Sequence, residues 1–131
     1  PEAADIVMKT KIPKTIVPSE IGRYFAYFSS KQVDKIRKTN KTGEFFAEMF
    51  EGYKSKYIMD ATETNDLSAI MYLIYPEIFT TYKCSISVDL DTMPGKTEIY
   101  ETPNGNITFV ENVNRKEFFK LFMQSLKAIK D

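Results

Sequence analysis

The hydrophobic pattern of this chain changes its period at Pro76, and this change constrains the fold more than any other feature. Before the proline, an apolar run opened by Asn65 and Asp66 predicts a helix, which ends where proline offers no backbone donor. After it, residues 81–90 alternate between apolar and polar, as in a half-buried strand. The alternation is carried by Tyr82, Cys84, Ile86, Val88 and Leu90. Helix and strand patterns mixed in one chain predict an α/β fold.

The segments that precede this helix can be read with the same two periods. Residues 1–9 are predicted to be a helix, and residues 12–17 a short β-branched strand bounded by prolines. Residues 19–28 are rich in aromatic side chains but fit neither period. Ser29 and Ser30 are candidate N-caps for the next helix. We expect the first helix to turn Ala3, Ala4, Ile6 and Val7 inward, and the second to bury Val33 and Ile36.

An aromatic stripe marks the segment just before Asn65. From Glu44 to about Tyr57, large apolar residues recur at three- and four-residue steps, which predicts a helix with one broad face. A face of this kind is usually part of the core. Its members are Phe45, Phe46, Met49, Phe50, Tyr53 and Tyr57.

The last third of the chain predicts two more strands and a final helix. Residues 97–101 and 107–110 follow turn sequences, and we expect them to pair as a hairpin or at an edge. Asn114 is a candidate N-cap for the closing helix. The apolar surface of that helix is made by Phe118, Phe119, Leu121, Phe122, Leu126 and Ile129.

The composition indicates one globular domain without a charge bias toward any class of partner. The 131 residues contain 18 basic and 18 acidic side chains, so no overall field attracts nucleic acid or an anionic membrane. The single cysteine, Cys84, excludes an internal disulfide and fits a reducing compartment. No apolar run approaches the roughly 20 residues that span a bilayer. We therefore expect a soluble, cytoplasmic protein with Cys84 as a buried thiol.

Histidine is wholly absent, which removes a large part of the enzyme repertoire from this chain. It excludes nucleophile systems and metal sites built on histidines of these 131 residues. Carboxylates remain, and Asp66 at a helix mouth can either cap backbone N–H groups or hold a cation. Asp89 and Asp91, two residues apart on a predicted strand, can share a face that binds a cation or is merely solvated.

Several motifs together resemble one known family in their order and spacing. They are the Pro1–Val7 turn, the β-branched run that ends at Val17, the helix opened by Asn65-Asp66 and closed at Pro76, and the final strand and helix from Val110 to Leu126. This order is similar to the C-terminal part of the inosine-uridine-preferring nucleoside hydrolases. The resemblance implies an α/β fold with an open, mostly parallel sheet flanked by helices. It also implies that residues 1–131 are a C-terminal fragment of that domain, without its N-terminal half.

The resemblance assigns roles to the Asn65-Asp66 pair. Asp66 matches a ligand of the Ca²⁺ ion that holds the ribose hydroxyls and the attacking water, and the other ligands lie outside this chain. Asn65 takes the place of a histidine that helps the base to leave by donating a proton. Asparagine donates hydrogen bonds but cannot protonate a leaving group. The intact protein is thus expected to hydrolyse the N-glycosidic bond of ribonucleosides in purine and pyrimidine salvage, and the fragment alone to be inactive.

Other positions either extend this assignment or depart from the family pattern. Tyr53, Tyr57 and Phe50 are candidates for contact with the nucleobase. Gly22-Arg23 stands where the family often has Thr-His, and Leu67-Ser68 replaces a common Pro-Leu. The resemblance also implies a homo-oligomer. The competing interpretation is a non-catalytic or degenerate α/β interaction module.

Overall fold

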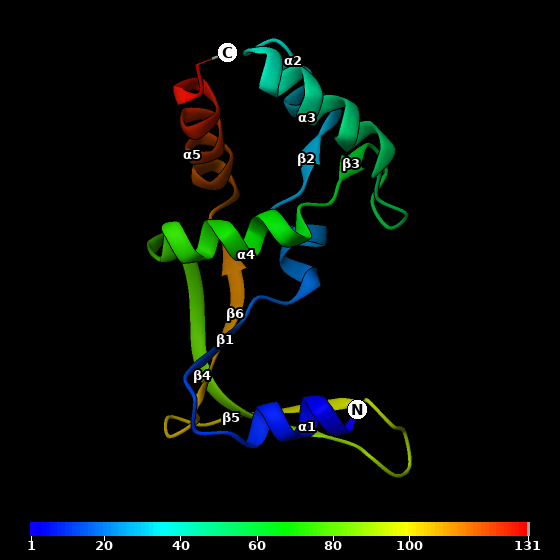
Figure 1. Cartoon of the computed structure of the whole chain (residues 1–131), viewed down its shortest axis with the longest axis vertical. Coiled ribbons are helices and arrows are strands. Elements are labelled where there is room, and N and C mark those ends of the chain that lie inside the picture. The colour runs from blue at the N-terminus through cyan, green and yellow to red at the C-terminus, as the bar shows by residue number, and fades with distance from the viewer. Residues whose placement is uncertain (131) are drawn as a thin grey trace. The chain divides into compact units, whose positions relative to one another are not determined.

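The computed structural model describes residues 1–130, which form two compact units (Figure 1). The first unit comprises Pro1–Ile16 and Thr81–Glu111. The second comprises Val17–Thr80 and the residues from 112 onward. Helices and strands are mixed along the chain, which confirms the α/β prediction. No helix in residues 1–130 combines the length and the apolar character that a membrane crossing needs.

The first unit is built on a four-stranded sheet in the order β1-β6-β4-β5, with strands paired in both directions. β1 (Lys14–Ile16) runs parallel to β6 (Ile107–Val113), and β4 (Phe79–Val88) runs antiparallel to β5 (Thr97–Glu101). Because β4 separates β5 from β6, the expected hairpin between the last two strands is wrong. β5 is an edge strand that pairs back onto β4 instead.

The alternating strand places its cysteine in the core, as predicted. Cys84 on β4 is fully buried, and burial raises the pKa of its thiol. Val88, Ile107 and Val110 are buried on the same sheet. The period-2 pattern therefore identified the buried face of this strand, but the strand ends at Val88, and Leu90, the last residue of the predicted alternation, lies beyond it and is exposed.

The first helix, α1 (Glu2–Lys9), forms where predicted but does not bury the predicted face. Ile6 and Val7 are 65% and 52% exposed, and Ala3 and Ala4 are exposed too. The buried residue of this helix is Asp5, whose carboxylate accepts a hydrogen bond from Lys9 Nζ at 2.6 Å. An amphipathic period shows which face of a helix is apolar, but that face is buried only if another element packs on it. None of the described residues covers the apolar face of α1.

The second unit carries most of the helices. It contains a π-helical turn η1 (Ile21–Phe25), α2 (Ser30–Arg37), α3 (Lys41–Gly52), α4 (Asn65–Ile74), a short 3₁₀ turn η2 (Pro76–Ile78) and α5 (Arg115–Ala128). Two short strands, β2 (Phe28–Ser29) and β3 (Ala61–Thr62), pair antiparallel. The irregular aromatic segment that fitted neither period is the one that forms η1 and β2.

Phe28 is the centre of the core of this unit. It is 1% exposed, and the rings of Phe50, Phe118, Phe119 and Phe122 surround it, with centroids 5.1 to 6.1 Å away. Aromatic pairs at these separations, mostly tilted or edge-on, add to the gain from burial. The aromatic ring cluster thus joins the closing helix α5 to β2 and α3.

The predicted helix starts are confirmed where a polar side chain caps them. The Gln32 carboxamide oxygen accepts hydrogen bonds from the Ser29 backbone N–H at 3.0 Å and the Ser29 hydroxyl at 3.2 Å, at the start of α2. Asn114 accepts from the backbone N–H of Glu117 at 3.2 Å, at the start of α5. Val33 and Ile36 are buried, as predicted.

The aromatic helix is shorter than predicted, and most of its stripe is not core. α3 ends at Gly52, and Ser55 then accepts hydrogen bonds from the backbone N–H groups of Tyr57 and Ile58. A serine that bonds nearby backbone donors competes with helix continuation. The residues that α3 buries are Gly43 and Ala47, because a Cβ on Gly43 would lie only 2.2 Å from the Ile36 carbonyl oxygen of α2. Large side chains are left outside this close contact; Phe45, Met49, Tyr53 and Tyr57 are exposed.

Asn40 links two helix ends, and its replacement tests their contribution to stability. Its Oδ1 accepts from the backbone N–H of Gly43 at 2.9 Å, at the start of α3. Its Nδ2 donates to the carbonyl oxygens of Leu126 at 2.8 Å and Ile129 at 3.2 Å, at the end of α5. We expect Asn40→Ala to lower the free energy of unfolding by about 1–3 kcal/mol, since it removes an N-cap and two donors together.

Chemical denaturation measures this loss, and Asn40→Ser is the matched control. Serine keeps an N-cap acceptor but has no amide donors for the end of α5, so its loss should fall between zero and that of Asn40→Ala. Equal losses for the two variants would show that the bond to Gly43 contributes nothing.

Candidate functional site

The predicted site residues line one pocket of the second unit. It has a volume of about 660 Å³, and its walls come from the end of α3, the loop that follows, and the first turn of α4. Phe50, Tyr53, Tyr57, Asn65 and Asp66 all contribute to its lining. The structure therefore brings together all five residues that the sequence singled out, although Tyr53 and Tyr57 lie beyond α3 rather than on it.

The start of α4, which carries Asn65 and Asp66, is fixed by two buried hydroxyl groups. Thr64 is 3% exposed and Ser68 is fully buried. The Ser68 hydroxyl donates to the Thr64 carbonyl oxygen at 2.8 Å, and the Thr64 hydroxyl donates to the carbonyl oxygen of Ala26 at 3.2 Å. The two hydroxyl oxygens lie 3.2 Å apart. Buried polar groups need such partners, so this pair determines how α4 begins.

Gly22 of η1 lies directly against this first turn. The backbone N–H of Thr64 donates to the Gly22 carbonyl oxygen at 3.2 Å. A Cβ at Gly22 would lie 2.5 Å from the Asn65 backbone nitrogen and 2.6 Å from Asn65 Oδ1. Only glycine allows η1 and α4 to approach this closely. Gly22 and Ser68, two of the positions that depart from the family pattern, thus both support the start of α4.

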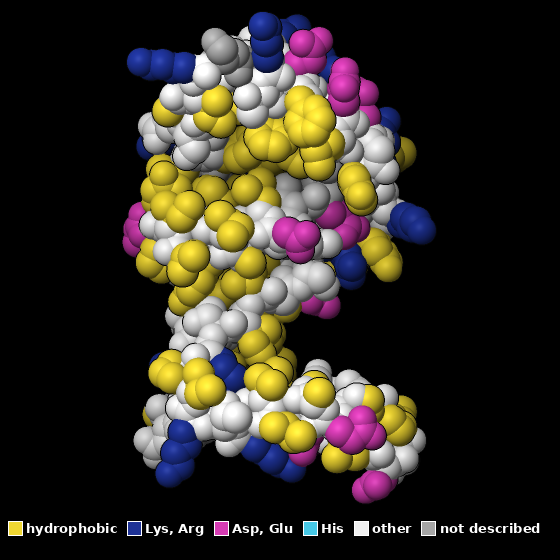
Figure 2. Space-filling view, viewed as in Figure 1, with side chains coloured by type: hydrophobic (Ala, Val, Ile, Leu, Met, Phe, Trp, Pro, Cys, Tyr) yellow, Lys and Arg dark blue, Asp and Glu magenta, His cyan; other side chains and the backbone are white. Residues whose placement is uncertain are grey.

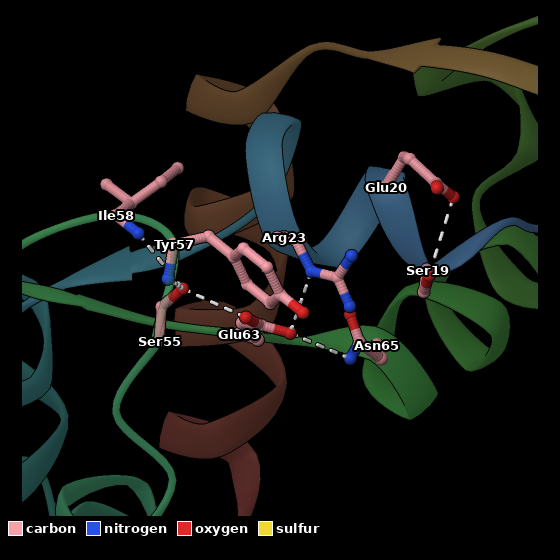
Figure 3. A network of polar contacts seen from close by, with 8 residues as sticks. All are labelled: Ser19, Glu20, Arg23, Ser55, Tyr57, Ile58, Glu63 and Asn65. Atoms are coloured by element: carbon pink, nitrogen blue, oxygen red, sulfur yellow. Dashed lines mark hydrogen bonds and ion pairs between the residues drawn. The ribbon is translucent and has the colours of Figure 1, made fainter.

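Glu63 collects three hydrogen bonds just before α4 (Figure 3). Its Oε1 accepts from the Ser55 hydroxyl at 2.9 Å. Its Oε2 accepts from Asn65 Nδ2 at 3.1 Å and from Arg23 Nε at 3.4 Å. The Arg23 guanidinium in turn lies over the Tyr57 ring, 4.2 Å from its centroid. One carboxylate therefore joins η1, the loop after α3 and the start of α4.

The ionisation of Glu63 follows from these partners. Burial raises the pKa of its carboxyl group, but the hydrogen bonds from Ser55, Asn65 and Arg23, together with the charge of Arg23, outweigh burial and leave the pKa below its ordinary value. Glu63 is thus a carboxylate at neutral pH. The stability that its ionisation contributes is present above the ordinary pKa of a glutamate and is lost as the pH falls through the lowered value.

Asp66 is exposed at the pocket and does not act as a helix cap. Thr64 occupies the N-cap position without a side-chain cap bond, and no residue among 1–130 hydrogen-bonds the Asp66 carboxylate. The capping interpretation of Asp66 is therefore wrong. Its charge still favours the N-terminal end of the helix dipole, and its two oxygens are available to a ligand in the pocket.

The second acidic pair lies in a turn rather than on a strand face. Both Asp89 and Asp91 lie beyond the end of β4, so they do not share a strand face. Asp89 accepts hydrogen bonds from the backbone N–H groups of Asp91, Thr92 and Met93, and these bonds hold its pKa below the ordinary value. Its carboxylate organises a turn. Within residues 1–130, no group of three or more potential metal-binding side chains comes together.

Sequence reasoning missed most of the residues that organise the pocket. The sequence points to neither Ser55 nor Glu63, it marks Thr64 only as a candidate helix cap, and it marks Arg23 only as a departure from the family pattern. The four-residue spacing from Thr64 to Ser68 was the available signal, because a serine at that distance can bond the carbonyl one turn earlier. The contacts of Glu63 with Arg23 span 40 positions and leave no local signal.

Comparison with solved structures places this architecture among the nucleoside hydrolases. A purine-preferring ribonucleoside hydrolase from Gardnerella vaginalis superposes on 97% of this chain and 43% of its own, with a TM-score of 0.81 at 21% identity. The plant nucleoside hydrolase PpNRh1 covers 98% of this chain and 46% of its own, with a TM-score of 0.80 at 19% identity. At these identities the likeness shows the fold alone.

The family itself follows from the sequence comparison. Residues 1–120 match the model of the inosine-uridine preferring nucleoside hydrolases, and the chain belongs to that family. The pyrimidine-specific ribonucleoside hydrolase RihA of Photobacterium profundum is 27% identical over 96% of this chain and 44% of its own length. The non-specific ribonucleoside hydrolase RihC of Salmonella paratyphi B is 28% identical over 68% of this chain and 29% of its own. The chain thus spans less than half the length of these relatives.

The close approach at Gly22 can be tested with an alanine scan of two glycines. We expect Gly22→Ala to lower the free energy of unfolding by about 1–3 kcal/mol, because a methyl group there would overlap the backbone of Asn65. Gly52→Ala is the control, since a Cβ at that helix end meets nothing within 4 Å. Thermal or chemical denaturation measures both. A Gly22→Ala variant as stable as wild type would refute the tight contact.

Proposed function

We propose that this chain is the C-terminal part of a nucleoside hydrolase that cleaves the N-glycosidic bond of ribonucleosides to base and ribose with calcium assistance. The supporting observation is the single pocket in which Asn65 and Asp66 lie together with Phe50, Tyr53 and Tyr57. The relatives named above are pyrimidine-specific, non-specific and purine-preferring ribonucleoside hydrolases. Since they differ in base preference, the substrate proposed is the class of ribonucleosides.

Asp66 is the residue proposed to contribute to calcium binding. Carboxylate oxygens are the ligands that Ca²⁺ prefers, and the exposed Asp66 carboxylate has no competing hydrogen bond among residues 1–130. Ca²⁺ takes about six to eight oxygen ligands, so the residues present fit one position of its shell and the remainder must come from elsewhere. A bound Ca²⁺ would supply charge that orients ribose hydroxyls and water.

A paramagnetic cation tests the Asp66 assignment on the chain as it stands. Mn²⁺ also binds carboxylate oxygens, and we expect it to broaden the amide NMR signals around residues 65–67 at lower concentration than signals elsewhere. Asp66→Asn should abolish this local broadening. Asp91→Asn, an exposed carboxylate in the turn after β4, is the matched control and should leave it unchanged. Stronger broadening around residues 89–91 than around Asp66 would contradict the proposal.

Asn65 is proposed to stand beside the departing base without supplying its proton. Cleavage of the C–N bond sends the bonding electrons to the base, and water adds to the ribose carbon that loses it. An amide can donate a hydrogen bond to the base but cannot transfer a proton. This pocket therefore favours nucleosides whose base leaves readily, and any proton must come from water or from a side chain other than Asn65.

Replacing Asn65 by histidine tests this role in the complete hydrolase. Histidine titrates near neutral pH and can act as a general acid, a contribution that can reach about 10²-fold or more. We expect Asn65→His to raise kcat/KM for inosine by up to about 10²-fold and to introduce a new pKa in the pH profile. Asn65→Gln, which keeps an amide, should do neither. Equal activity of the histidine and glutamine variants would refute the proposed role.

The rest of the domain is proposed to cover the apolar faces that this chain leaves exposed. Ile70, Leu73 and Ile74 are 54%, 78% and 56% exposed, and Figure 2 shows hydrophobic side chains gathered over α4. In the other unit, Ile6 and Val7 of α1 are exposed in the same way. Faces of this kind usually mark an interface. The preceding half of a hydrolase domain, or a second copy in a homo-oligomer, would bury them.

Two wider assignments follow from the same proposal. A cytoplasmic location is supported by the single buried thiol of Cys84, which needs no oxidising compartment. A role in purine and pyrimidine salvage follows from the release of free base and ribose.

The competing function is a non-catalytic α/β interaction module. It is favoured by Asn65 and by the lack of a three-ligand metal group among residues 1–130. The proposal itself expects no hydrolysis of uridine or inosine by the 131-residue chain alone. The Asn65→His experiment in the complete protein separates the two functions, because a module without the remaining site residues would show no activity with either residue.

A further inference from the structure

Three segments in and beside the pocket wall bond to a single half-buried carboxylate. Only 17% of the Glu63 side chain is exposed, and its partners Ser55, Arg23 and Asn65 come from different parts of the chain. Figure 3 shows these side chains converging on Glu63 from the loop after α3, from η1 and from α4. Charge-assisted hydrogen bonds of this kind are stronger than neutral ones.

The first consequence concerns the orientation of the Asn65 amide. Its Nδ2 donates to Glu63 Oε2 at 3.1 Å, while its Oδ1 lies against Gly22, 2.6 Å from where a Cβ of that residue would be. The reversed amide would bring Oδ1 against the Glu63 carboxylate, where two acceptors repel. Glu63 therefore determines which way round the Asn65 amide lies.

The second consequence concerns Tyr57. The Ser55 hydroxyl donates to Glu63 and also accepts hydrogen bonds from the backbone N–H groups of Tyr57 at 3.1 Å and Ile58 at 3.2 Å. On the other side, Arg23 donates to Glu63 and lies over the Tyr57 ring. The backbone of Tyr57 is thus linked to Glu63 through Ser55, and its ring is linked to Glu63 through Arg23.

We propose that Glu63 is a positioning residue of this pocket, which orients the Asn65 amide and holds the Tyr57 ring against Arg23 so that a planar base can stack on the ring. The guanidinium covers part of the ring, yet the Tyr57 side chain is 63% exposed and lines the pocket. Bases stack favourably on exposed aromatic rings of this kind. The identity of this ligand as the base of a nucleoside rests on the proposed function.

The test uses NMR of the 131-residue chain with uridine as the probe. In Glu63→Gln we expect the side-chain amide signals of Asn65 and the ring signals of Tyr57 to shift together, and the Kd for uridine to rise about fivefold. Glu48→Gln makes the same charge change on an exposed position of α3 and should alter neither. Backbone signals outside the pocket report whether the variants fold.

A second variant separates the two arms of the network. Ser55→Ala removes the contact that leads to the backbone of Tyr57 but leaves the contact with Asn65. It should therefore shift the Tyr57 signals and leave the Asn65 amide signals in place. A folded Glu63→Gln variant whose Asn65 and Tyr57 signals match wild type would overturn the positioning role.

The uridine arm distinguishes failure of this role from failure of the proposed function. If uridine shifts no pocket signal in the wild-type chain, the nucleoside assignment fails, while the amide and ring shifts still decide the role of Glu63. If uridine binds wild type and Glu63→Gln equally well, Glu63 does not position the binding surface and the proposal is refuted.

Discussion

The pocket depends on the contact between Gly22 and the first turn of α4. The Gly22 carbonyl oxygen accepts the backbone N–H of Thr64, and the absent Cβ leaves room for the Asn65 backbone. Thr64 and Ser68 then bury their hydroxyl groups beneath the same turn. Moving backbone atoms costs more free energy than moving the end of a flexible side chain. This contact therefore fixes where Asn65 and Asp66 lie relative to η1. Asn65 and Asp66 line the pocket because this turn is held in place.

The sequence predicted those parts of the fold that are encoded locally. The α4 helix between Thr64 and Tyr75, the alternation on β4 and the Asn114 cap all arise from residues a few positions apart. The predictions failed where burial depended on distant partners. The predicted inner face of α1 is apolar but exposed. In α3, Gly43 and Ala47 are the residues buried against the neighbouring structure, and the aromatic stripe lies beside them. A period identifies a face, whereas packing decides which face is covered.

The candidate site divides in the same way. Asn65, Asp66 and the aromatic candidates could be named from sequence because a helix mouth and a stripe are local patterns. Glu63 could not, since its partners Ser55 and Arg23 lie 8 and 40 positions away. The long-range contacts explain why Arg23 looked like an isolated departure from the family. In the structure Arg23 and Asn65 both donate hydrogen bonds to Oε2 of Glu63. Gly22 lies directly against Asn65. The three departures from the family pattern are therefore in contact with one another, directly or through Glu63.

This connected group bears on what the pocket can do chemically. By the resemblance, Arg23 and Asn65 stand at positions where the family often has histidine, and neither of these side chains can exchange a proton near neutral pH. Glu63 holds both of them, and its lowered pKa means that it is a proton acceptor only in acid. The network is thus built for fixed geometry and fixed charge rather than for proton transfer. Under the proposed function, the charge of a cation held by Asp66 and the stacking of the base would lower the barrier instead. The pocket lining also includes Tyr53, Lys54, Lys56 and Tyr57, so a proton for the departing base would come from water or from one of these side chains rather than from this network.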